Sequence, residues 1–447
     1  MRKDMLSKIL VIGVIALFVG ISFTGSSYSL SNEFIVGDND LQLNISGGYI
    51  IDIDGVTVLH VKGSYYEMGF QHGSLLKEEC LQLLRAVIHN AEEHDITYED
   101  LLEVWDFYKN FTPQNHIDEL QGFADGLDMP FEYIVAGYLG HYKTPHNSRF
   151  LPIECCNFAA WGPATTDGKL YHGRSYDSPI WLKDPESGVY VVQENQIVII
   201  REPDDGYASM SVNVAGYLGI LGGFNEQGVV IGINGIDSND EKRNGTLVAD
   251  LMKYILDHTS TAQEAIGLIM GNKTSGRAYI ISDYKIPASY AVEISANLSY
   301  VGTWDDPVES LYPFWEINKV IRRVNLYNNQ TLALTQREKY NTKSFISFLL
   351  GKNKYFPMWR HYRALSIGIE HYWGNLNSDS MIKILRNTYN GKIDFLFFIA
   401  TKLHILEVWH QWIVCPETGD MWFMLASDGK SSFKNKVHHV NFFDFIE

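Results

Sequence analysis

The sequence predicts a layered domain of the α+β class. Strand-forming runs crowd the middle of the chain, from residue 189 to residue 237, whereas helical spacing of apolar residues dominates before residue 130 and again after residue 342. Runs of strands flanked by runs of helices favour sheets and helices that lie in separate layers. The chain has 447 residues, of which 46% are hydrophobic, and is therefore long enough to bury a large core.

Charge and motif content exclude several classes of function. The formal net charge of -17 argues against nucleic acid, or an anionic membrane surface, as the main partner. We interpret the acidity as a contribution to solubility. The sequence has no GxGxxG after a strand, no Walker loop, no HExxH and no CxxC pair. We therefore expect no cofactor and no metal.

The first 29 residues have the pattern of a targeting segment. Basic residues at Arg2, Lys3 and Lys8 precede an apolar run over Ile9–Phe23, and small residues follow as far as Ser29. This order predicts a secretory signal and a secreted or extracytoplasmic location. A short anchor that tethers the protein to a membrane is the alternative, because roughly 15 apolar residues are fewer than a bilayer span needs.

Cysteines and asparagine sequons bear on the same prediction. Cys155 and Cys156 are adjacent and rarely bridge each other, so a disulfide would join Cys80 to Cys415 if Cys155 is a nucleophile. The sequence leaves that pairing open. N-x-Ser/Thr sequons typical of an exported glycoprotein occur at Asn44, Asn110, Asn244, Asn272, Asn297 and Asn329.

Before residue 153 the chain is mostly helical. Ile50–Val61 predicts one or two strands around Asp54-Gly55, and the glycine-spaced stretch Gly63–Gly73 leads into a helix with apolar residues at helical intervals. We interpret its glycines as sites of close helix packing, in preference to a catalytic role for His72. Further expected elements are helices at Tyr98–Tyr108 and Ile117–Leu127 and an exposed loop at Leu139–Pro152.

The segment Ile153–Ser178 predicts a β-hairpin. Asp167-Gly168 lies between two runs of strand-forming residues, and both residues tolerate the positive φ that tight turns need. A turn centred there puts Cys155 opposite about residue 178 and makes Asp177 its neighbour. Arg174 then lies close to both residues along the same strand.

A thiol, a guanidinium and a carboxylate at one end of a hairpin can perform nucleophilic chemistry. A fixed positive charge stabilises the reactive thiolate, and a carboxylate can orient the base that takes the proton. The alternative is that Cys155 and Cys156 are small core residues, with Arg174 and Asp177 forming a surface ion pair.

The rest of the chain predicts paired strands and then helices. The apolar run Phe395–Leu406 is too short to span a membrane, so we expect it to be buried or to form an apolar wall for an acyl chain. Expected strands are Tyr190–Arg201, Ala208–Val214, Tyr217–Phe224, Val229–Asn234, Ala278–Ser282, Ser289–Ile294, Glu407–Cys415 and Met421–Leu425, and expected helices are Ala262–Met270 and parts of Thr342–Thr388.

The hairpin carries a family resemblance. The run C-C-N-F-A-A-W-G, followed by T-D-G-K-L-Y-H-G-R-S-Y-D, resembles the nucleophile segment of the isopenicillin N acyltransferase-like branch of the N-terminal nucleophile (Ntn) hydrolases. That branch is related to choloylglycine hydrolases, penicillin V acylases and, more distantly, phospholipase B-like proteins. The resemblance implies that Cys155 is the nucleophile and that Arg174 and Asp177 belong to its site. Cys156, where the family has Ser or Thr, is the alternative nucleophile.

Two further segments resemble the same family. G-G-F-N-E-Q-G-V-V-I-G-I-N-G matches a hairpin whose final asparagine helps to form the oxyanion hole, which implies that role for Asn234. L-Y-P-F-W-E-I-N-K resembles the family's Trp-Arg-Thr-Asn-His segment and implies a second site amide at Asn318. This sequence departs from the pattern at Glu154, where the family usually has Gly, at Ser175, where it has Asn, and at Ile317 and Lys319.

The resemblance implies a fold, a boundary and an activity. The fold is a four-layer αββα sandwich, with a mostly helical pro-segment over residues 30–154 and a catalytic core over residues 155–447 that autocatalytic cleavage before Cys155 releases. The activity is hydrolysis or transfer of the acyl group of a small-molecule or lipid acyl amide through a cysteine thioester. A phospholipase B-like lipid acyl hydrolase and a non-catalytic exported glycoprotein with the same fold are the alternatives.

Overall fold

The computed structural model describes residues 41–143, 155–178, 182–337, 355–393, 395 and 407–446, all within one compact unit. The expected signal or anchor over residues 1–29, Glu154 and all but one residue of the run Phe395–Leu406 lie outside the described residues. Among the described helices, none combines the length and the apolar character that crossing a bilayer requires.

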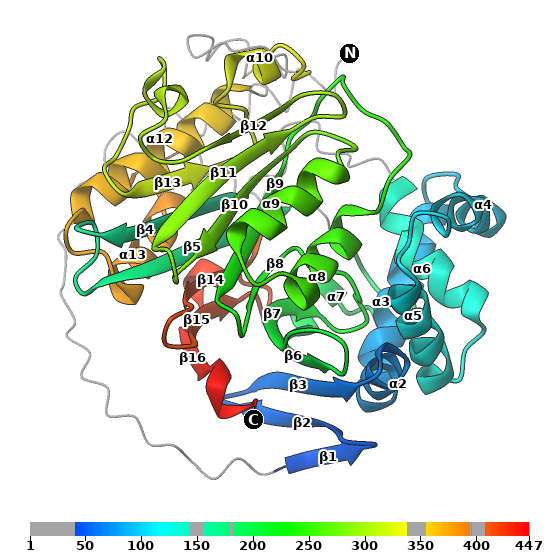
Figure 1. Ribbon diagram of the computed structural model, residues 1–447. Helices are drawn as coiled ribbons and strands as arrows, with labels where there is room; N and C mark the ends of the chain where they lie inside the picture. Colours follow the sequence, from blue (N-terminus) through cyan, green and yellow to red (C-terminus); the bar gives the residue numbers. More distant parts are fainter. Residues whose placement is uncertain are drawn as a thin grey trace, which may run out of the picture. The chain divides into compact units, whose positions relative to one another are not determined.

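Two β-sheets form the centre of the molecule (Figure 1). Neighbouring strands are antiparallel, except that β3 and β6 pair in parallel. In spatial order, the ten-stranded sheet contains β1 (Leu41–Ile45), β2 (Gly48–Ile53), β3 (Val56–Gly63), β6 (Gln196–Pro203), β7 (Ser209–Val214), β8 (Gly222–Asn225), β9 (Val229–Gly235), β10 (Arg277–Asp283), β11 (Ala288–Ile294) and β12 (Ser299–Gly302). The six-stranded sheet contains β13 (Val320–Arg323), β4 (Cys156–Gly162), β5 (Gly168–Ser178), β14 (Glu407–Cys415), β15 (Asp420–Leu425) and β16 (His438–Asn441).

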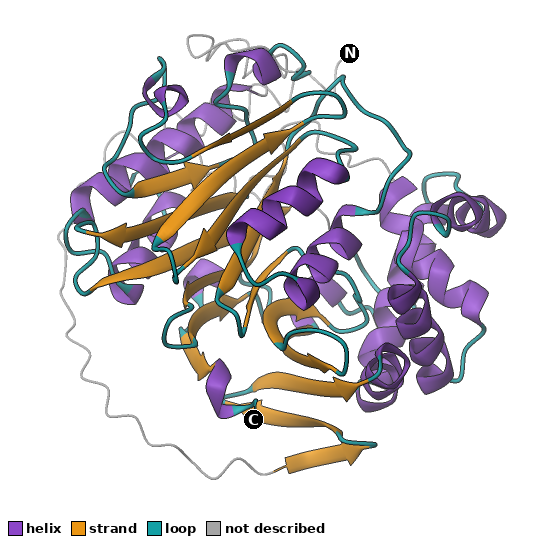
Figure 2. Cartoon of the chain, viewed as in Figure 1, coloured by secondary structure: helices purple, strands orange, loops and turns teal. Residues whose placement is uncertain are grey.

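Helices cover the outer faces of both sheets (Figure 2). The helices before the hairpin are α2 (Tyr65–Leu75), α3 (Lys77–Glu92), α4 (Tyr98–Tyr108), α5 (Gln114–Leu127) and α6 (Phe131–Lys143). Those after it are α7 (Val191–Glu194), α8 (Val248–His258), α9 (Ala262–Gly271), α10 (Gln330–Ala333), α12 (Tyr355–Tyr372) and α13 (Ser378–Tyr389). Short 3-10 turns lie at Pro307–Ser310, Ser432–Lys434 and Phe442–Asp444.

The buried side chains show four layers. α8 and α9 pack on the outer face of the ten-stranded sheet through residues such as Leu251 and Ile269, which contact Ile231 and Tyr279. α12 and α13 pack on the outer face of the six-stranded sheet. Between the sheets, Ala159 and Trp161 of one sheet contact Ile280 and Ala291 of the other. The layer order is therefore helix, sheet, sheet, helix, which confirms the expected αββα sandwich.

The first three strands, which precede the expected boundary at residue 154, belong to the ten-stranded sheet. β3 pairs with β6 over six residue pairs, from Val58–Val198 to Gly63–Pro203, so the segment before the hairpin contributes to the central sheet. α2 to α6 then pack over the same sheet through one core that includes Leu59, Val61 and Ile197. Residue 154 does not separate two folded units, because backbone hydrogen bonds join the segments on either side of it.

Most expected elements are present, and some boundaries differ. The strand expected over Tyr190–Arg201 begins only at Gln196, because Val191–Glu194 forms a helical turn. The strand expected over Tyr217–Phe224 is reduced to Gly222–Asn225, because the Asn213 side chain donates hydrogen bonds to the main-chain oxygens of Tyr217 and Gly219 and holds that stretch as a loop. The loop expected over Leu139–Pro152 is wrong for its first residues, because α6 continues to Lys143, and its remainder lies outside the described residues.

The glycines of α2 and α5 allow these two helices to touch. A Cβ added to Gly69 would lie 2.0 Å from the main-chain oxygen of Glu119, and one added to Gly122 would lie 1.9 Å from that of Tyr66. Gly73 and Gly126 continue the same contact one turn further along. The stretch Gly63–Gly73 therefore serves helix packing, as expected.

Replacing Gly122 with alanine should destabilise the protein by several kcal/mol, on the order of 2–4 kcal/mol, because backbone would have to move to admit the methyl group. The free energy of unfolding, measured by urea denaturation with circular dichroism, checks this. Gly267→Ala is the matched control: it lies on α9 with open space around its Cα, and helix propensity alone should leave it neutral or about 1 kcal/mol more stable. Equal stability of the two variants would contradict the prediction.

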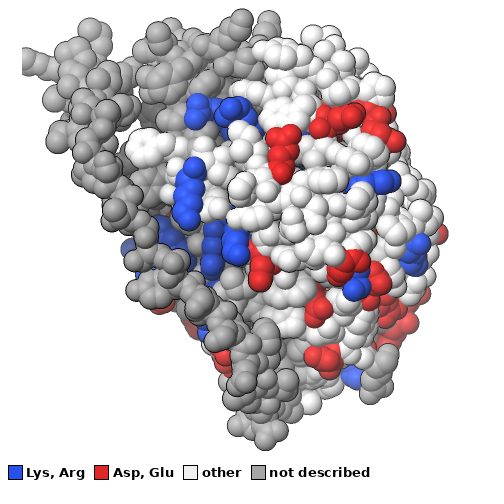
Figure 3. Space-filling view, turned by 90° about the vertical axis from the view of Figure 1, so that its left-hand side faces the viewer, with Lys and Arg blue, Asp and Glu red and all other residues white. Residues whose placement is uncertain are grey.

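Charges of both signs are spread over the face in Figure 3, with uncharged surface between them. The negative net charge is therefore not concentrated on this part of the described surface.

Candidate active site

Cys155 lies directly before β4, at the point where the hairpin approaches the ten-stranded sheet. Its side chain is 2% exposed, and its Sγ lies 4.0 Å from the main-chain oxygen of Asp177. Burial raises the pKa of the Cys155 thiol to about 11, although the Arg174 charge and the Asn325 side chain act in the opposite direction. The thiol is therefore protonated at neutral pH and needs a base before it can attack a carbonyl.

Strand alternation separates Cys155 from Cys156. Cys156 packs among apolar residues of α12 and α13, and its Sγ lies 3.9 Å from the Tyr389 hydroxyl. Asn157 lies two residues after Cys155. Its side chain points to the opposite side from that of Cys156 and hydrogen-bonds to Asn234 of the ten-stranded sheet. Because side chains alternate along a strand, Cys155 shares the inner face with Asn157, and Cys156 belongs to the outer face.

Asn234 occupies the end of β9 with its amide held in one orientation. Asn157 donates a hydrogen bond from Nδ2 to Oδ1 of Asn234 at 2.8 Å, and both side chains are fully buried. Gly232 makes room for this contact, since a Cβ there would lie 2.1 Å from Asn157 Oδ1. Within the described part of the chain, Asn234 Nδ2 has no hydrogen-bond acceptor. A buried and unsatisfied amide donor is what an oxyanion would need.

Arg174 brings a buried positive charge to the same inner face. Its Nη2 donates to the main-chain oxygen of Ile233 at 3.0 Å, and its guanidinium lies over the Tyr176 ring, 4.9 Å from the centroid. Arg174 Nε and Nη1 are buried without acceptors among the residues described. The Arg174 charge favours the ionised form of Cys155, so it opposes the effect of burial on that thiol.

Asp177 reaches the site through its main chain, while its carboxylate points to the helix layer. Ser175 Oγ donates to Oδ1 at 2.6 Å, and the Tyr389 hydroxyl donates to Oδ2. Burial raises the pKa of Asp177 to about 8, against the effect of these hydrogen bonds and of Arg174. The hairpin therefore does make Cys155 and Asp177 neighbours, in a register where Cys156 lies opposite Ser175.

The structure does not place Asn318 near Cys155. Asn318 is exposed in the turn before β13, where its main-chain oxygen accepts a hydrogen bond from Trp373 Nε1. β13 pairs with β4 so that Val320 lies opposite Ala160 and Arg323 lies opposite Asn157. Asn318 thus lies at the far end of β4 from Cys155.

Asn325, which no sequence motif indicated, lies near Cys155. It follows β13 at the end that lies next to Cys155, and its Nδ2 donates to the main-chain oxygen of Gly235 at 2.7 Å. The Asn325 side chain lowers the pKa of the Cys155 thiol, and its Oδ1 is buried without a partner among the residues described. The asparagine beside Cys155 is therefore the one at the end of β13, and the expectation that Asn318 lies in the site is wrong.

All four cysteines are free and buried. Cys80 lies in the core formed by α2 to α6, and Cys415 lies in the core beneath α12 and α13, so no disulfide joins this pair. Across the described ranges, no group of His, Cys, Asp and Glu has the arrangement of a metal site.

Three curated relatives are similar to this chain. An uncharacterized protein of Archaeoglobus fulgidus is 26% identical over 304 residues, which is 60% of this chain and 48% of the relative. Protein dcd1B of Dictyostelium discoideum is 22% identical over 292 residues, 59% of this chain and 55% of its own. Protein dcd1A of the same organism is 24% identical over 355 residues, 71% of this chain and 76% of its own. The chain thus spans about half the length of the first two.

Solved structures are similar at lower identity. A mutant of the conjugated bile acid hydrolase from Clostridium perfringens matches with a TM-score of 0.41 and 13% identity, covering 65% of this chain and 93% of that one. Penicillin V acylase from Agrobacterium tumefaciens matches with a TM-score of 0.38 and 14% identity, covering 64% of this chain and 86% of that one.

The family model that matches is acyl-coenzyme A:6-aminopenicillanic acid acyl-transferase, over residues 164–345. This range contains Arg174, Asp177, Asn234 and Asn325, and it begins after Cys155. Over residues 164–345, this match confirms the resemblance to the acyltransferase family found in the sequence.

Proposed function

We propose that this chain is a cysteine-dependent Ntn enzyme that hydrolyses or transfers the acyl group of an N-acyl amide. One observation carries the proposal: Cys155, the Arg174 guanidinium and the unsatisfied amide of Asn234 share the inner face where the two sheets meet. The three groups supply a nucleophile, a charge that favours its thiolate and a donor for an oxyanion.

The reaction begins with a proton transfer at Cys155. Cleavage of the chain between Glu154 and Cys155 frees an α-amino group, which accepts the thiol proton. The thiolate then attacks the substrate carbonyl, a carbon–sulfur bond forms, and the carbonyl oxygen becomes an oxyanion that accepts a hydrogen bond from Asn234 Nδ2. The leaving amine departs with the proton from the α-ammonium, and a thioester remains. Water, or a second amine or alcohol, resolves it and releases the thiol.

The proposal extends to location and to the fate of the first segment. Residues 1–29 would direct export or tether the protein to a membrane, and the sequons would carry glycans. Residues 41–154 would stay with the core after cleavage, because β3 and β6 remain hydrogen-bonded. The cleaved enzyme would therefore be a complex of two chains.

Intact masses and N-terminal sequences of purified protein test this proposal. We expect a chain of 293 residues, 447 minus 154, that begins at Cys155 and copurifies with the preceding segment. Cys155→Ala should yield a single uncut chain, whereas the control Cys156→Ser should still be cut, because Cys156 faces the helix layer. An uncut wild-type chain, or cleavage that depends on Cys156 and not on Cys155, would contradict the proposal.

A substrate screen completes the test. N-acyl amides should be turned over by the cleaved protein and not by Cys155→Ala. Turnover of phospholipids alone would replace the amidase with a lipid acyl hydrolase, and absence of turnover in both classes, with no labelling of Cys155 by a thiol probe, would favour a binding protein.

A further inference from the structure

Both carboxylate oxygens of Asp177 accept hydrogen bonds from hydroxyl groups. Ser175 Oγ donates to Oδ1 at 2.6 Å, and the Tyr389 hydroxyl donates to Oδ2. Asp177, Ser175 and Tyr389 are all fully buried. Hydrogen bonds donated to both oxygens favour the ionised form of Asp177 over the protonated form.

Each hydroxyl is itself held by a nitrogen from another element. Gln411 of β14 donates from Nε2 to Ser175 Oγ at 3.1 Å. His361 of α12 has its Nε2 at 3.1 Å from the Tyr389 hydroxyl, and since that hydroxyl gives its proton to Asp177, His361 Nε2 is the donor. Two hydrogen-bond chains, one from β14 and one from the helix layer, therefore converge on Asp177.

Packing around Tyr389 fixes the second chain. The Tyr389 ring stacks on Phe433 with 5.9 Å between centroids, and the His361 ring meets it edge-on at 5.6 Å. Tyr389 belongs to the last turn of α13 and is fully buried. These ring contacts hold the Tyr389 side chain beside Asp177.

We propose that Tyr389, oriented by His361, is a positioning residue that favours the ionised form of Asp177 and fixes its carboxylate beside the nucleophile segment. This role rests on the proposed function, because it concerns the freed α-amino group of Cys155 that acts as the base. An ionised carboxylate next to the start of β4 favours the protonated form of a nearby amino group, and so makes the freed α-amino group a stronger base toward the thiol. Tyr389 lies 212 residues from Asp177 in sequence.

Several titratable groups lie near Asp177, and their charges and hydrogen bonds determine the pKa of its carboxyl group. Arg174 and Tyr176 come from β5, Cys155 and Cys156 from the region of β4, and Tyr389 from α13. On β14, Glu407 bonds to Ser431, and His410 stacks on Tyr176. Burial raises the pKa of Asp177 to about 8, and the hydroxyl donors and Arg174 lower it. Loss of the Tyr389 hydroxyl should therefore raise that pKa further.

The variant Tyr389→Phe tests the proposal through the pH profile of kcat with an N-acyl amide. Activity that needs ionised Asp177 falls as the pH drops, so the acidic limb of the variant should move to higher pH by about one unit. Relative to wild type, the variant should lose about tenfold more activity at pH 6.5 than at pH 9.5. Tyr362→Phe, the same change at a buried tyrosine of α12 that is not a hydrogen-bond partner of Asp177, should leave the limb in place. A uniform loss at all pH values would overturn the proposal.

Two further measurements distinguish a failure of this proposal from a failure of the proposed function and from a folding defect. Infrared difference spectra should show a protonated carboxyl band that titrates in wild type, is absent in Asp177→Asn and moves to higher pH in Tyr389→Phe. This readout needs no turnover, so an unshifted band overturns the role of Tyr389 even if the enzyme acts on amides, whereas a shifted band without amide turnover refutes only the proposed function. If Tyr389→Phe does not fold, His361→Phe should shift the band and His361→Gln, which keeps an N–H donor, should restore it.

Discussion

Replacing Asn234 with alanine should lower kcat by about 10²- to 10³-fold, because the oxyanion loses a preorganised donor in a buried site. Asn157→Ala should lower kcat by a smaller factor, on the order of tenfold, since the Asn234 amide remains but loses the hydrogen bond that orients it at 2.8 Å. Steady-state kinetics with an N-acyl amide substrate, and the rate of chain cleavage, are the two measurements.

A neighbouring asparagine provides the matched control for Asn234. Asn225 in β8 is also buried, but its Nδ2 donates to the main-chain oxygens of Leu256 and Thr259 at 2.8 Å each, so it anchors the end of α8. Asn225→Ala should reduce the free energy of unfolding and leave kcat of the folded protein close to wild type. If both variants lose kcat in equal proportion, Asn234 acts through stability and the assignment of an oxyanion donor is wrong.

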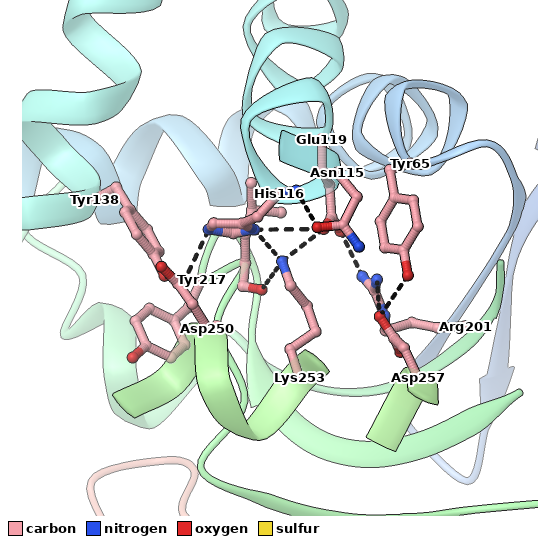
Figure 4. A network of polar contacts seen from close by, with 12 residues as sticks. Tyr65, Asn115, His116, Glu119, Tyr138, Arg201, Tyr217, Asp250, Lys253 and Asp257 are labelled. Carbon is pink, nitrogen blue, oxygen red and sulfur yellow. Dashed lines mark hydrogen bonds and ion pairs between the residues drawn. The ribbon is translucent and has the colours of Figure 1, made fainter. Parts of the chain in front are cut away.

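The second large effect is expected at Glu119, in the buried ionic network of Figure 4. Glu119 Oε1 pairs with Arg201 of β6, and Oε2 lies 2.6 Å from Lys253 Nζ of α8. Asp257 also pairs with Arg201, at 3.5 Å, and His116 Nε2 lies 3.0 Å from Asp250 Oδ1. One carboxylate on α5 therefore compensates two cations that lie after residue 155 in the sequence.

The ion pairs of this network require Glu119 to be ionised. Burial by itself would raise the pKa of Glu119, but Arg201 and Lys253 hold that pKa well below its ordinary value. Glu119→Leu would leave both cations buried without their shared partner, and breaking a buried pair in this way costs about 3–5 kcal/mol. Urea denaturation should show the loss as a lower midpoint.

An exposed ion pair supplies the control for Glu119. Glu241 and Arg337 are 3.2 Å apart, with side chains 42% and 53% exposed, so Glu241→Gln should change stability by less than about 1 kcal/mol.

Because Glu119 precedes the proposed cleavage point and its partners follow it, Glu119→Leu should also weaken association of the two chains after cleavage. A midpoint equal to wild type would show that the network adds no net stability.

Local sequence patterns were sufficient for the elements around the nucleophile. Asp167-Gly168 predicted the hairpin because few residues other than Gly accept its backbone conformation, and Gly168 indeed has a φ of +78°. Side chains alternate along a strand, so the order Cys155, Cys156, Asn157 also implies that Cys155 and Asn157 share a face. No sequence motif marked Asn157 as a site residue. Glycine spacing of four in α2 likewise predicted a close helix contact.

The second amide shows where a local pattern fails. Asn318 and Asn325 flank the same short strand, and the motif L-Y-P-F-W-E-I-N-K favoured the first. Only the antiparallel register of β13 on β4, with Arg323 opposite Asn157, shows that the end of β13 and not its start lies beside Cys155. Strand order and register depend on long-range packing, which a single segment does not encode.

The sequence by itself determined the layered class, the hairpin, and the presence of Cys155, Arg174, Asp177 and Asn234 in segments suited to a site. Only the tertiary structure decided which side chains complete that site, because each contact joins elements that are distant in sequence. Asn157 meets Asn234 across 77 residues where two sheets stack, and Tyr389 meets Asp177 across 212 residues where a helix covers a sheet. Burial of these polar groups in a dry interior makes their hydrogen bonds obligatory, and the packing of the layers selects the partners.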